Sequence, residues 1–115
     1  MDPVPRYRFD RMVSEALDAL PPELDHVLDN VVVQVRERNH EEPELLGLYQ
    51  GVPRTTYGAD QVSVPSKITI FRGPLTRAYR TPTALAAGVT DTVYHEIAHH
   101  FGISDARLHE LRGGR

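Results

Sequence analysis

The chain has 115 residues, of which 40% are hydrophobic, 25% are charged and none is cysteine. This length suits one domain with a single modest core, so we expect residues 1–115 to form one unit. A formal net charge of −3 gives no general attraction to nucleic acid or to an anionic membrane, because binders of either usually carry a basic surface. Without cysteine, any metal must be held by nitrogen and oxygen atoms.

The N-terminal segment, residues 1–8, lacks the apolar core of a signal peptide. No run of residues approaches the length of a transmembrane helix. We therefore expect a cytoplasmic location and no membrane partner.

Helical periodicity begins soon after the N-terminus. Apolar residues recur at helical spacing over residues 9–20, and Pro21-Pro22 then stop the pattern. A second short helix can follow over residues 23–28. The first of these stripes is interpreted as part of the core.

Three segments have the residue types of β-strands: residues 31–36, 45–50 and 67–72. The first is rich in valine and begins as a continuous apolar run, which suits a strand covered on one or both faces. In the third, Ile68 and Ile70 alternate with other residues until Gly73-Pro74 end the strand. Residues 51–65 show no period and are expected to form a long loop.

A longer helix is expected to begin after Pro82, with Thr83 as its cap, and to end near Phe101. Four apolar residues recur on it at every fourth position: Val89, Val93, Ile97 and Phe101. Helices, then strands, then helices around one core predict an α+β fold.

This helix carries the pattern H-E-x-x-H from His95 to His99. Four residues along a helix turn it by about 40° and advance it by about 6 Å, so the two imidazoles point the same way and can hold one metal ion. The apolar stripe lies about 200° away, so one face packs and the other presents ligands. Glu96, about 60° from His99, can reach a water on that metal without ligating it. The spacing indicates a metal-activated hydrolase; two solvated histidines are the alternative.

A hydrolytic zinc site needs three protein ligands and an open position for water. Gly102 follows His99 by three residues, where glycine commonly ends a helix, and the chain can then reverse to return the Asp105 carboxylate to the metal. His95, His99 and Asp105 would complete the ligand set of a Zn²⁺ ion. Asp105 can also cap a helix over residues 106–111, and the two roles are compatible.

Other side chains are open alternatives for roles at this site. His100 is expected to pack beside the metal ligands or to contact them, and His109 or Glu110 can replace Asp105 as the third ligand. Asp91, one turn before His95, can orient an imidazole or can be a solvated carboxylate. The candidates for stabilising an oxyanion are four tyrosines: Tyr49, Tyr57, Tyr79 and Tyr94.

The extended pattern H-E-x-x-H-x-x-G-x-x-D resembles the zinc-binding signature of metzincin metallopeptidases, in the variant with Asp as third ligand. Together with residues 45–53 and 68–72, the block 95–108 is similar to the small bacterial zincin-like metallopeptidase family. Metzincins carry a Met-turn after the third ligand, whereas Met1 and Met12 are the only methionines here. The resemblance therefore favours a minimal zincin without a Met-turn.

The resemblance implies a small mixed β-sheet packed against the active-site helix, with residues 45–50 as the edge strand that lines the cleft. It also implies zinc-dependent hydrolysis of peptide bonds in a peptide or protein substrate, with Glu96 as the general base. An extended peptide could add to that edge as a further strand.

Two other functions remain open. The spacing of His95, His99 and Asp105 also resembles the zinc pattern of the bacterial ribosome-maturation endoribonuclease family. In that family the residue after the first histidine is typically glycine, so Glu96 favours a peptidase. The third hypothesis is a non-catalytic module that binds zinc or captures peptides.

Overall fold

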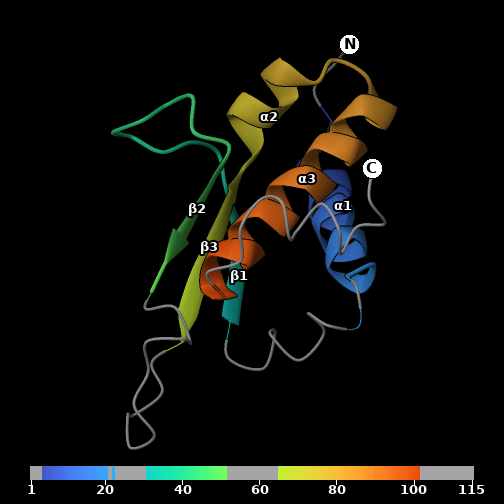
Figure 1. Ribbon diagram of the computed structural model, residues 1–115. Coiled ribbons are helices and arrows are strands. Elements are labelled where there is room, and N and C mark those ends of the chain that lie inside the picture. Colours follow the sequence, from blue (N-terminus) through green and yellow to red (C-terminus); the bar gives the residue numbers. More distant parts are fainter. Residues whose placement is uncertain (1–3, 21, 23–30, 52–64, 102–115) are drawn as a thin grey trace, which may run out of the picture.

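The computed structural model describes residues 4–20, 22, 31–51 and 65–101. Along the chain its elements are α1 (Arg6–Asp18), β1 (Val31–Arg36), β2 (Gly47–Gln50), β3 (Ser66–Phe71), α2 (Arg72–Ala78) and α3 (Pro82–Phe101) (Figure 1). This is the expected α+β class. The expected helix at 23–28 and nearly all of the expected loop at 51–65 lie outside the described residues. Within the described part, no helix is long and apolar enough to cross a membrane.

The three described strands form one mixed sheet in the order β1-β3-β2. β1 runs parallel to β3, and β2 runs antiparallel to it. Val33 and Tyr49 are both paired with Ile68, so these three side chains share one face of the sheet. β2 is therefore an edge strand, as expected for residues 45–50, although it begins only at Gly47.

Helices α1 and α3 lie together on the face of the sheet that carries Ile68 (Figure 1). The apolar stripe of α3 packs into this core, since Val89, Val93 and Ile97 are each 0% exposed. Burial of that stripe stabilises the fold and fixes the rotation of α3 about its axis. The opposite face of α3, with His95 and His99, is left exposed.

Helix α1 starts and ends earlier than the periodicity of residues 9–20 indicates. It begins at Arg6, directly after Pro5, and ends at Asp18. Arg6 forms an ion pair with Asp10 one turn later, at 3.0 Å, which supports the first turn. The chain thus leaves the helix before Pro21.

The expected end of the third strand at Gly73-Pro74 is wrong. β3 stops at Phe71 and the chain continues directly into α2, so both residues lie in the first turn of a helix. Proline is tolerated there because the first turn leaves its backbone N–H groups without helical partners. Gly73 N–H instead donates to the carbonyl of Glu37, at 2.8 Å.

The expected cap of α3 at Thr83 is also wrong, by two residues. Thr81 accepts a hydrogen bond on its side-chain oxygen from the backbone N–H of Ala84, at 3.1 Å. Pro82 is then the first residue of the helix, a position that proline favours. Thr81 is the N-cap of the helix that carries the histidines.

Replacing Thr81 with Ala is expected to lower the free energy of unfolding by about 1 kcal/mol, because an N–H of the first turn loses its acceptor. Urea unfolding measures the change. Thr83→Ala is the matched control: this exposed threonine lies two residues further along, inside the helix, and its loss should not destabilise the protein. Equal destabilisation by the two substitutions would contradict the assignment of the cap.

Candidate active site

His95 and His99 lie one turn apart on the exposed face of α3. Their ring centroids are 5.5 Å apart, with the rings inclined by 71°. The side chain of His99 is 53% exposed. The structure thus brings the two expected histidines together at the surface, with their rings near enough to bind the same ion.

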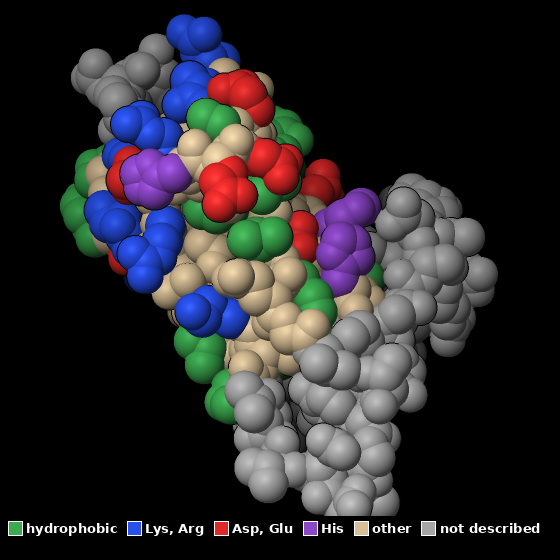
Figure 2. Space-filling model, turned by 90° about the vertical axis from the view of Figure 1, so that its left-hand side faces the viewer, with side chains coloured by type: hydrophobic (Ala, Val, Ile, Leu, Met, Phe, Trp, Pro, Cys, Tyr) green, Lys and Arg blue, Asp and Glu red, His purple; other side chains and the backbone are tan. Residues whose placement is uncertain are grey.

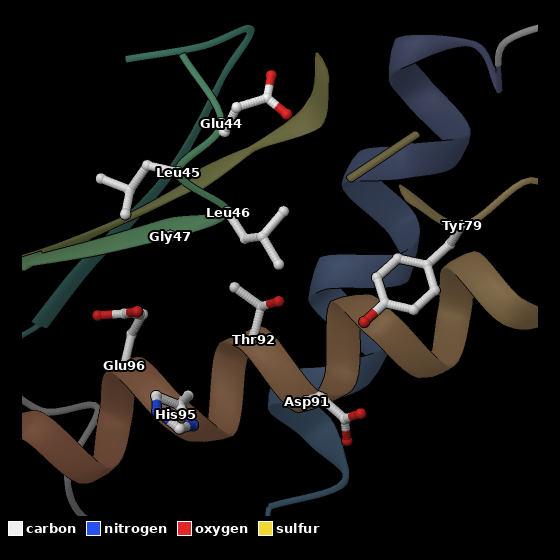
Figure 3. A pocket seen from close by; sticks show the side chains of 9 residues that line it. All are labelled: Glu44, Leu45, Leu46, Gly47, Tyr79, Asp91, Thr92, His95 and Glu96. Atoms are coloured by element: carbon white, nitrogen blue, oxygen red, sulfur yellow. The ribbon is translucent and has the colours of Figure 1, made fainter. Parts of the chain in front are cut away.

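Glu96 lies between these histidines in sequence, but its side chain is only 10% exposed. Its Oε1 is 3.3 Å from Nδ1 of His99. In Figure 3 its carboxylate extends from α3 toward the end of β2 that contains Gly47. The helix therefore presents two exposed imidazoles and one buried carboxylate side by side.

Burial raises the pKa of Glu96 above its ordinary value, because the charged form loses water contacts. The charges of His99 and His95 act in the opposite direction, as do hydrogen bonds from the His99 side chain and from the backbone of Tyr49. Burial has the larger effect in the protein without metal. A carboxylate whose pKa is raised is a stronger proton acceptor than a solvated one.

This raised pKa predicts a pH-dependent stability of the metal-free protein. The folded state binds a proton on Glu96 more tightly than the unfolded chain does, so its stabilising contribution is complete below the ordinary value of 4.5 and is lost as the pH rises through the folded pKa. Glu96→Gln cannot ionise. Relative to wild type, the variant should gain stability as the pH rises from about 4.5 through the raised pKa of folded Glu96.

Urea unfolding of both metal-free proteins across that range measures the difference. Glu42→Gln, which changes an exposed carboxylate outside the site, is the control for the loss of one negative charge. A wild-type-to-Glu96→Gln difference that stays constant with pH would contradict the raised pKa.

A cavity of about 410 Å³ opens beside His95 and Glu96, between α3 and the segment that leads into β2. Leu46 from the strand side and Thr92 from the helix point toward each other across it, and Tyr79 lies at its far end (Figure 3). Its described walls also include three carboxylates, from Glu44, Asp91 and Glu96, and no Lys or Arg. The cavity can accept an apolar side chain adjacent to the histidine pair.

The structure separates the four tyrosine candidates. Tyr94 is buried in the core and donates its hydroxyl to the carbonyl of Ala19, at 2.9 Å, so it does not reach the site. Tyr49 shares a hydrogen bond with the hydroxyl of Ser66, at 3.1 Å. Tyr79 lines the cavity. Tyr57 lies outside the described residues.

The expected third ligand, Asp105, lies outside the described residues, as do its alternatives His109 and Glu110 and the side chain of His100. Within the described part of the chain, no group of three His, Cys, Asp or Glu residues could hold a metal ion. His95 and His99 fit a metal centre as two of its ligands, and the Glu96 carboxylate lies nearby and can accept a proton.

The sequence alone indicates no role for Thr92 or for Gly47. Thr92 is three residues before His95, a spacing that puts two side chains on neighbouring positions of a helix surface. A glycine inside a strand often marks a close approach by another part of the structure.

A helix with H-E-x-x-H against the edge strand of a small mixed sheet is the arrangement expected of a zincin. In a comparison with models of protein families, residues 28–115 match the model of zincin-like metallopeptidases. The chain belongs to the zincin-like metallopeptidase family. Membership implies a hydrolase and a metal, typically zinc. No curated protein matches the chain.

Proposed function

We propose that this protein is a zinc-dependent peptidase in which His95, His99 and Asp105 hold the metal and Glu96 is the general base. The observation that carries the proposal is the contrast within one helical turn. The imidazoles are exposed to a ligand, whereas the carboxylate between them is buried, with Oε1 3.3 Å from Nδ1 of His99.

The proposed ligands have the nitrogen and oxygen donors that zinc takes in catalytic sites, with one position left for water. When bound, zinc supplies a Lewis acid and lowers the pKa of its bound water far below that of bulk water, to about 7. Asp105 is anionic, so it reduces the net charge at the centre compared with a third histidine.

Glu96 has the position and the chemistry of the group that moves the proton. Its carboxylate takes a proton from the attacking water as the water oxygen bonds to the scissile carbonyl carbon. It then returns that proton to the amine nitrogen as the C–N bond breaks. The surrounding protein raises the pKa of Glu96 in the absence of metal, and raised carboxylate pKa values cluster at sites of this kind.

The cavity beside Glu96 gives the peptide a place to bind. An extended peptide along β2 could insert one apolar side chain between Leu46 and Thr92, next to the reacting groups. We therefore propose a peptide or protein as the substrate.

The charge distribution favours this substrate over RNA. RNA binding relies on cations that neutralise phosphates, but the described walls of the cavity contribute carboxylates. Figure 2 draws one face of the molecule. Its Lys and Arg side chains gather mainly on the left-hand side, whereas a histidine group on the right-hand side adjoins acidic atoms. We also propose that the peptidase acts in the cytoplasm.

Glu96→Gln is expected to keep bound zinc and to lower kcat for peptide hydrolysis by about a hundredfold or more, because the water loses its proton acceptor. Metal analysis and mass spectrometry of a cleaved peptide mixture measure the two effects, with Glu42→Gln as the control that retains activity. Cleavage of RNA but not peptides, or bound zinc with neither activity, would contradict the proposal.

Asp105→Ala is expected to weaken zinc binding by about tenfold or more, since the centre loses one of three protein ligands. Competition with a zinc-sensitive chelating dye measures the affinity. His109→Ala and Glu110→Ala are the matched comparisons. If zinc is released by one of these and not by Asp105→Ala, the third ligand has been misassigned.

A further inference from the structure

Along β2, the backbone N–H and C=O groups of successive residues point alternately toward β3 and toward the outer edge of the sheet. The carbonyl of Leu46 accepts a hydrogen bond from the N–H of Phe71 on β3, at 2.9 Å. In an antiparallel pair, residues whose backbone groups bond to the partner strand alternate with residues whose backbone groups point away from it. Leu46 is of the first kind, so the backbone groups of Gly47 and Tyr49 point away from β3, toward the outer edge of the sheet. From this edge the backbone of Tyr49 forms a hydrogen bond with the Glu96 carboxylate.

Gly47 lies directly against the side chain of Glu96. A Cβ atom at this position would lie 2.8 Å from Cγ2 of Thr92, 3.0 Å from Cγ of Glu96 and 3.2 Å from its Oε2. Among the described glycines only Gly51 has positive φ. The backbone conformation at position 47 therefore does not require a glycine. It is required because there is no space for a side chain.

Thr92 cannot turn its methyl group away without losing a hydrogen bond. Its hydroxyl donates to the carbonyl of Gly88 one turn earlier, at 2.8 Å, and its side chain is buried. The approach of β2 to α3 is therefore limited by this methyl group and by the stem of Glu96. The Thr92 methyl group and the Glu96 stem both lie against Gly47, which has no Cβ.

We propose that Gly47 is a positioning residue for the general base: by lacking a side chain, it lets the Tyr49 N–H hold the Glu96 carboxylate at one place beside His99. The inference deepens the proposed peptidase function and rests on it. The base is then fixed from two elements, by its own helix and by the edge strand. It also follows that the Tyr49 N–H is already used and does not pair with an added peptide strand.

The test begins with Gly47→Ala in the zinc-loaded protein. The new methyl group would displace the Glu96 stem, and a displacement of about 1 Å at a reacting group can cost about a hundredfold in rate. We expect kcat to fall by about that factor, with KM and zinc content little changed. A lower kcat/KM that results from a higher KM alone, with kcat unchanged, would overturn the inference.

A second variant separates base positioning from strand packing. Thr92→Ser removes the methyl group that the new Cβ would meet first, and keeps the hydroxyl that bonds to Gly88. Gly47→Ala combined with Thr92→Ser should regain part of the stability that Gly47→Ala loses, because the contact with the Glu96 stem remains, while its kcat stays about a hundredfold below that of Thr92→Ser alone. Full recovery of kcat would show that packing, and not Glu96, caused the loss.

An NMR measurement tests the inference without any activity. In wild type the Tyr49 amide proton should resonate downfield because it bonds to a carboxylate, and Gly47→Ala should move it upfield. An unchanged Tyr49 resonance in Gly47→Ala would overturn the positioning role. If the resonance moves but the wild-type protein cleaves no peptide, the positioning contact stands and the peptidase proposal fails.

Discussion

The structure depends on how it accommodates one buried carboxylate, that of Glu96, between a helix and a strand. Removing a carboxylate from water is costly unless the group gains partners. Here the partners are the Tyr49 backbone and the His99 ring. The His99 ring comes from the same helix, but the Tyr49 backbone is a partner only because the edge strand lies close to α3, and that approach depends on Gly47. The geometry of the site is thus set by the contact between β2 and α3.

The helical half of the site could be predicted because its information is local. A period of four residues places Val89, Val93 and Ile97 on one side of α3, and all three are buried. The same period turns His95 and His99 to the opposite, exposed side. Packing of the stripe and presentation of the ligands are two consequences of one rotation of the helix.

The other half could not be predicted, because it depends on distances between elements. Nothing near Gly47 in sequence indicates that its neighbours in space are Thr92 and Glu96. Tyr94 adjoins His95 in sequence yet points into the core, where it reaches Ala19. The edge position of β2 was expected from the family resemblance, not from the residues of the strand. Local signals also misplaced the cap of α3, because two threonines flank Pro82.

The most direct measurement is a crystal structure of the full chain grown with zinc, with anomalous scattering recorded at the zinc edge. We predict one peak, with a nitrogen of His95, a nitrogen of His99 and a carboxylate oxygen of Asp105 at about 2.0–2.2 Å, and with Glu96 nearby but not coordinated. A peak away from the two histidines, or Glu96 as a zinc ligand, would contradict this prediction.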